Sequence, residues 1–142
     1  MRALGIDPGD RRIGVALSDP TGTLASPLKV LAHISRKIDA ASIAEIAREE
    51  GVGLIVVGQA TNIDGQPTVQ GRKAARLAAA IKTQTDTPVQ LWDESYSTQQ
   101  AQAAGRIAGM PRKKRGGHLD ELAAAVILQS YLDAQKDTKD VS

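Results

Sequence analysis

The hydrophobic pattern of this chain first changes its period at about residue 36, and that change limits the folds open to it. Before this point, apolar residues occur in short or alternating runs, which is typical of strands. The strands predicted from these runs cover residues 3–7, 12–18 and 24–31. Turns rich in Asp, Pro and Gly separate them, at residues 7–10 and 19–22. Three strands joined by short turns predict an antiparallel meander.

Beyond that point, helical and strand patterns alternate. Apolar residues at Ala40, Ile43, Ala44 and Ala47 recur at the spacing of a helix over about 36–50, and Gly51 suits its C-cap. The predicted elements that follow are a strand at 54–57, a helix after residue 67, a strand at 88–92, a helix from residue 97 and a last helix from about 119 to 134. This order predicts an α/β fold. Its mixed five-stranded sheet combines the antiparallel meander with two parallel strands and has helices on both faces.

The length of 142 residues fits a single domain with a continuous core. We expect that domain to span residues 1–134, followed by a polar tail at 135–142. The apolar run at the N-terminus is too short for a signal peptide, and no segment approaches the roughly 20 apolar residues of a membrane helix. These features favour a soluble, cytoplasmic protein.

Composition restricts the chemistry of any site. The chain has no cysteine, which excludes disulfides, thiol catalysis and zinc sites built on cysteine. His33 and His118 are its only imidazoles. A metal ion would therefore be held mainly by carboxylates, which favour Mg²⁺ or Mn²⁺.

Basic residues gather in three places although the net charge is only +2. Each cluster could be an ordinary solvated surface or a contact to nucleic-acid phosphates. The candidate nucleic-acid contacts are Arg11, Arg12, Arg72, Lys73, Arg112, Lys113, Lys114 and Arg115. The three aromatic residues, Trp92, Tyr96 and Tyr131, do not favour a base-stacking platform. Nucleic acid would therefore be bound through its backbone.

Three acids occur where a site of such a fold would lie. Asp7 ends the first strand, Glu94 follows the last strand, and Asp120 opens the final helix. Each alone has an ordinary explanation as a turn residue, a solvated acid or an acid that complements a helix dipole. Together they would converge, and converging carboxylates repel unless a proton or cation lies between them. Two metal ions about 4 Å apart would neutralise them and could hydrolyse a phosphodiester.

Four stretches of sequence resemble one known family. They are LGIDPGDRRIGVALSD at 4–19, IVVGQATNIDG at 55–65, DESYST at 93–98 and LDELAAAVILQSYLD at 119–133. On these motifs the chain resembles the YqgF family of small ribonuclease-H-like proteins, related to Holliday-junction resolvases. The resemblance implies a ribonuclease-H-like fold and a nuclease that processes the 5′ end of pre-16S ribosomal RNA. It also implies that Asp7, Glu94 and Asp120 are the catalytic, metal-binding carboxylates.

The chain departs from the family pattern at two points and from the related resolvases at a third. Gln59-Ala60 stands where the family usually has Leu-Pro, and Ser95 where it usually has arginine. Loss of that arginine removes a phosphate contact or an ion pair but no acid. Ala123 occupies the position at which the related resolvases carry a fourth acid. The resemblance therefore implies a site of three carboxylates.

Two secondary candidates lie just before Asp120. The basic segment 112–115 could clamp phosphates or be a solvated loop, and His118 could shuttle a proton during product release or have no chemical role. Other functions also stay open. They are a Holliday-junction or branched-DNA resolvase, a non-catalytic ribosome-assembly factor that binds precursor particles, and an ATP-binding lobe, for which the chain is short. We expect a monomer or a weak homodimer.

Overall fold

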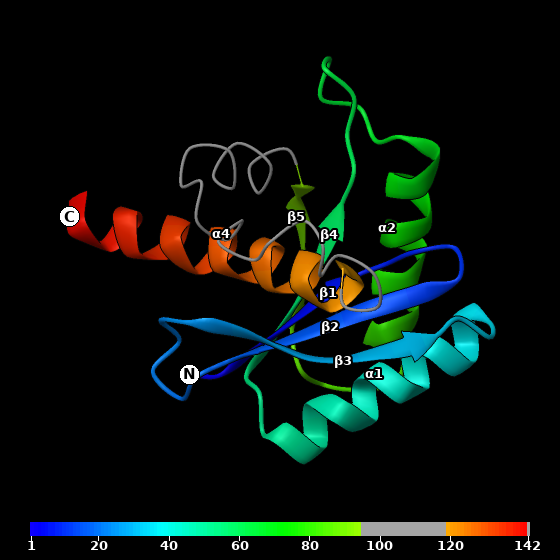
Figure 1. Cartoon of the computed structure of the whole chain (residues 1–142), viewed down its shortest axis with the longest axis horizontal. Helices are drawn as coiled ribbons and strands as arrows, with labels where there is room; N and C mark the ends of the chain where they lie inside the picture. Colours follow the sequence, from blue (N-terminus) through cyan, green and yellow to red (C-terminus); the bar gives the residue numbers. More distant parts are fainter. Residues whose placement is uncertain (95–118, 142) are drawn as a thin grey trace.

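The computed structural model describes residues 1–94 and 119–141, and Figure 1 shows their arrangement. The elements, in chain order, are β1 (Ala3–Asp7), β2 (Arg12–Ser18), β3 (Ala25–Ala32), α1 (Arg36–Glu50), β4 (Leu54–Gln59), α2 (Val69–Lys82), β5 (Val89–Asp93) and α4 (Leu119–Val141). In this part of the chain, no helix is both long and apolar enough to cross a membrane.

All five strands form one sheet, in the order β3-β2-β1-β4-β5. β2 pairs antiparallel with β1 and β3, while β4 pairs parallel with β1 and β5. This confirms the predicted mixed sheet. Pro27 is tolerated because β3 is an edge strand, where a missing backbone donor costs least.

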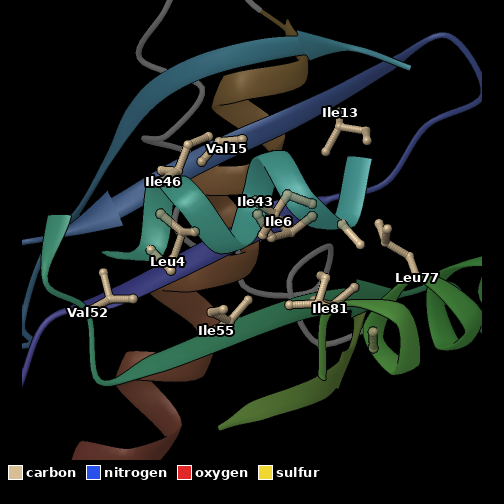
Figure 2. Packing of buried hydrophobic residues seen from close by; sticks show 14 of the residues in the cluster. Leu4, Ile6, Ile13, Val15, Ile43, Ile46, Val52, Ile55, Leu77 and Ile81 are labelled. Atoms are coloured by element: carbon tan, nitrogen blue, oxygen red, sulfur yellow. The ribbon is translucent and has the colours of Figure 1, made fainter. Parts of the chain in front are cut away.

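Helices cover both faces of the sheet, as predicted. α1 and α2 lie on one face and α4 crosses the other (Figure 1). Figure 2 shows the core under α1 and α2, where Leu4 and Ile6 of β1 meet Ile43 of α1 and Ile81 of α2. Ala3 belongs instead to the core under α4. Because side chains alternate along a strand, Gly5 and Asp7 also face α4.

Local sequence explains where α1 begins and ends. The Ser35 side chain accepts a hydrogen bond from the Ile38 amide at the N-cap. Gly51 adopts the left-handed conformation, with φ of 64°, and so confirms the predicted C-cap.

The prediction for the end of the last helix was wrong. Helix α4 does not stop near residue 134 but continues to Val141. The polar composition of 135–141 suggested a tail, yet this segment contains neither glycine nor proline, so nothing in it ends a helix. The helix predicted from residue 97 lies outside the described residues.

A glycine controls how closely α4 approaches the sheet. A Cβ added at Gly5 would lie 2.7 Å from Leu128 Cβ and 3.2 Å from the carbonyl oxygen of Ala124. Both atoms belong to or adjoin the helix backbone, so neither can rotate away. The absence of a side chain at Gly5 therefore sets the separation of α4 and β1.

We expect Gly5→Ala to lower the free energy of unfolding by about 1–3 kcal/mol, the usual cost of overpacking a core. Gly53→Ala is the matched control, because its new Cβ would meet only the end of the exposed Met1 side chain, which can move aside. Urea denaturation of both variants measures the difference. Equal stability of the two variants would contradict the close packing of α4 on Gly5.

Candidate active site

Asp7 and Glu94 meet at one edge of the sheet, the edge formed by the ends of its strands and not by its outermost strand. The parallel pairing of β1, β4 and β5 brings the carboxyl ends of these strands together, with β4 in the middle. Gly58 of β4 lies between the two acids. A Cβ added there would lie 3.0 Å from Glu94 Oε1 and 2.7 Å from Ile127 Cδ1. Glycine at this position therefore leaves space for the Glu94 carboxyl to reach across β4 towards Asp7.

The two carboxyl groups interact directly. Both residues are half-buried, and burial raises the pKa of Glu94. The hydrogen bond that Glu94 shares with the Asp7 side chain lowers the pKa of Glu94 in part, whereas the negative charge of Asp93 raises it further. Two carboxyl groups can share a hydrogen bond only if one of them holds a proton. The pair therefore has the property predicted from the sequence: a proton or a cation must lie between its members.

The backbone of Asp120 lies at the same edge. Asp120 is the second residue of α4, one helical turn before Ala124, whose carbonyl adjoins Gly5. Farther along α4, Gln129 Oε1 accepts a hydrogen bond of 2.9 Å from the Ala25 amide at the opposite edge. The helix therefore begins near the end of β1 and runs towards its start. The side chain of Asp120 lies outside the described residues, and those residues contain no group of three His, Asp or Glu side chains able to hold a metal ion.

Asp93 serves a different purpose from Glu94. Its Oδ1 accepts a hydrogen bond of 2.8 Å from Thr61 Oγ1, which holds the segment between β4 and α2. Trp92 packs on the α4 side, so strand alternation directs Asp93 to the other face. Of the two adjacent acids, Glu94 is the one that shares a hydrogen bond with Asp7.

The predicted basic contacts divide into three groups. Arg11 and Arg12 are exposed at the start of β2, directly after the turn that follows Asp7. Arg72 is exposed on α2 and donates to the Pro67 carbonyl at 3.3 Å. Segment 112–115 and His118 lie outside the described residues.

Lys73 has a structural partner that the sequence did not indicate. Its Nζ lies 3.2 Å from Asp10 Oδ1, and Gln70 Nε2 donates to Asp10 Oδ2 at 2.8 Å. The Gln70 hydrogen bond and then the Lys73 ammonium lower the pKa of Asp10. These contacts tie the turn between β1 and β2 to helix α2.

A buried acid in α1 also escaped prediction. Asp39 is only 4% exposed, and it accepts a hydrogen bond from the Ile34 amide while its Oδ2 lies 2.5 Å from His33 Nδ1. Its sequence position carried a signal, because Asp39 shares the inner face of the helix with Ile43, four residues later.

Solved structures share this fold. A complex of T. thermophilus RuvC with a Holliday junction substrate superposes with a TM-score of 0.64 at 17% identity, covering 97% of both chains. A complex of the fowlpox virus resolvase with Holliday junction DNA gives a TM-score of 0.57 at 13% identity, covering 95% of this chain and 99% of that one. These likenesses confirm the predicted ribonuclease-H-like fold.

Sequence relatives cover almost the whole chain. A protein of Thermoanaerobacter pseudethanolicus is 42% identical over 138 residues, covering 96% of this chain and 99% of that protein. One from Anaeromyxobacter sp. is 43% identical over 135 residues, covering 95% and 98%. Both are named "Putative pre-16S rRNA nuclease". The family described as "RuvX: Holliday junction resolvase" matches residues 1–134. The resemblance to the YqgF family, seen in the four motifs, is therefore confirmed by this match and by the names of the relatives. The chain belongs to the family described as RuvX.

Proposed function

We propose that this protein is a metal-dependent endonuclease that hydrolyses phosphodiester bonds during 5′-end processing of pre-16S ribosomal RNA. The observation that carries the proposal is the direct contact between the Asp7 and Glu94 carboxyls at the edge where β1 and β5 end. The names of the relatives support the choice of substrate. The protein would act in the cytoplasm, on free RNA or on ribosomal precursor particles.

Asp7, Glu94 and Asp120 would together hold Mg²⁺ or Mn²⁺, with two ions at most. The two described carboxyls fit such an ion, because they offer hard oxygen ligands and already need a positive charge between them. A bound ion would neutralise the charge that develops on the phosphodiester. The exposed Arg11 and Arg12 would contact phosphates beside the cleaved bond. The segment 112–115 and His118, which lie outside the described residues, stay candidates for a phosphate clamp and a proton shuttle.

Removing one of the paired acids should abolish cleavage without unfolding the protein. We expect Asp7→Asn and Glu94→Gln each to reduce Mg²⁺-dependent cleavage by roughly a thousandfold or more, because a metal ion supplies several kcal/mol of charge stabilisation. Asp86→Asn is the matched control, an exposed acid in the turn before β5, at the other edge of the sheet. Cleavage that persists in excess chelator would rule out the metal-dependent mechanism.

Metal binding can be measured apart from cleavage. We expect Mn²⁺ to raise the melting temperature of the wild-type protein, by an amount equivalent to about 2.7 kcal/mol at a hundredfold excess over Kd. Asp7→Asn and Glu94→Gln should lose this stabilisation. Without metal they should be at least as stable as wild type, because each removes one member of a carboxyl pair. Equal Mn²⁺ stabilisation of all three proteins would place the ion elsewhere.

Branched DNA is the second candidate substrate, favoured by the description of the family and by the junctions bound to two similar structures. Cleavage rates on a pre-16S 5′ leader and on a four-way DNA junction of matched length would decide between them. We expect the RNA precursor to be cut faster, at a single position. Faster cutting of the junction favours a resolvase, and binding of either without cleavage in Mn²⁺ favours a non-catalytic assembly factor.

A further inference from the structure

A pocket opens close to the candidate active site but on the other face of the sheet. Its volume is about 280 Å³, near the lower end of the roughly 300–1,000 Å³ of small-molecule sites. Three parts of the chain line it: the turn between β1 and β2 with the start of β2, the segment that leads from β3 into the first turn of α1, and residues 70–77 of α2. Such a pocket is large enough for a small anion with some of its water.

Positive charge exceeds negative charge in this pocket. Of the two carboxylates that line it, Asp10 is paired with Lys73, and Asp39 is paired with His33. Arg36 and Arg76 also line it, and neither forms a salt bridge with any residue that the structure describes. Two guanidinium groups from different helices therefore remain to attract an anion. Their planar forks match the oxygens of a phosphate.

His33 adds a directed polar group. Asp39 Oδ2 lies 2.5 Å from His33 Nδ1, and Asp39 Oδ1 accepts a hydrogen bond of 3.0 Å from the Ile34 amide. Asp39 is buried in the first turn of α1 and therefore fixes the imidazole on the pocket wall. Within the part of the chain that the structure describes, Nε2 forms no hydrogen bond. When this nitrogen carries a proton, it can donate a hydrogen bond to a ligand in the pocket.

We propose that this pocket binds a phosphate group, held by Arg36 and Arg76 and oriented by the His33–Asp39 pair. Pro8 and Gly9 line the pocket and directly follow Asp7, so the two sites share the turn between β1 and β2. The phosphate comes either from the backbone of a nucleic acid or from free inorganic phosphate. The first source rests on the proposed function, whereas the binding of phosphate does not.

A matched pair of double variants isolates the pocket. Arg36→Ala with Arg76→Ala removes both unpaired cations, one from α1 and one from α2. Arg48→Ala with Lys82→Ala removes one cation from the last turn of each of the same helices, outside the pocket. The two double variants therefore lose the same charge. Thermal unfolding checks that both are folded, and the single change Arg76→Gln repeats the test if the pocket variant is not.

The first measurement uses inorganic phosphate alone. We expect phosphate to shift the NMR signals of the His33 imidazole and the Gly9 amide in the wild type and in the Arg48/Lys82 control. The Arg36/Arg76 variant should bind phosphate at least tenfold more weakly. This measurement needs no nucleic acid and no cleavage, so it stands even if the proposed nuclease function fails.

The second measurement uses a fluorescein-labelled RNA hairpin over a salt series, in the Asp7→Asn background to prevent cutting. If a backbone phosphate occupies the pocket, the Arg36/Arg76 variant should bind the RNA about tenfold more weakly. The slope of the logarithm of its binding constant against the logarithm of the salt concentration should be smaller in magnitude by about one. If the Arg36/Arg76 variant keeps its RNA affinity while phosphate shifts the His33 and Gly9 signals of the wild type, free phosphate is the ligand. The proposal is overturned if phosphate shifts neither signal and the two double variants bind RNA equally.

Discussion

The close packing of helix α4 on strand β1 is the contact on which the rest of the site depends. Gly5 has no side chain, so the helix backbone lies directly on the strand at Ala124 and Leu128. One helical turn earlier along α4 is Asp120, and two residues later along β1 is Asp7. Because the helix runs against the strand direction, the same contact fixes both the separation of α4 and β1 and the relative position of the two acids along the chain backbone. A larger residue at Gly5 would alter both together.

A second glycine leaves room for the acids. Gly58 leaves space in which the Glu94 carboxyl reaches towards Asp7, and burial raises the pKa of Glu94. Two carboxyls in contact reduce the stability of the fold unless a proton or a cation lies between them. A packed core alone would have no use for this arrangement, since an apolar side chain at residue 94 would fill the same space favourably. Local electrostatic cost of this kind is typical of functional sites. The contact therefore argues for a site more strongly than the presence of the acids does.

Much of the fold followed from the sequence because its determinants are local. The change in hydrophobic period predicted the meander and the strand–helix units, and the rule that parallel strands end at one edge predicted the meeting of Asp7 and Glu94. Long-range partners could not be predicted in this way. Asp10 meets Lys73 across 63 residues, and the contact of the buried Asp39 with His33 was not predicted. The end of α4 was misjudged because polar composition was taken for the end of a helix.

The turn between β1 and β2 links the features on the two faces of the sheet. Asp7 begins it on the α4 side, while Pro8 and Gly9 line the pocket on the side of α1 and α2. A Cβ at Gly9 would lie 2.4 Å from the Arg12 carbonyl oxygen, so the turn is as tight as its backbone allows, and Asp10 fastens it to α2. The backbone therefore fixes where Asp7 lies at the start of the turn. An anion bound beside this turn would act on the same few residues, so occupancy of the pocket and the position of the Asp7 carboxyl should be coupled.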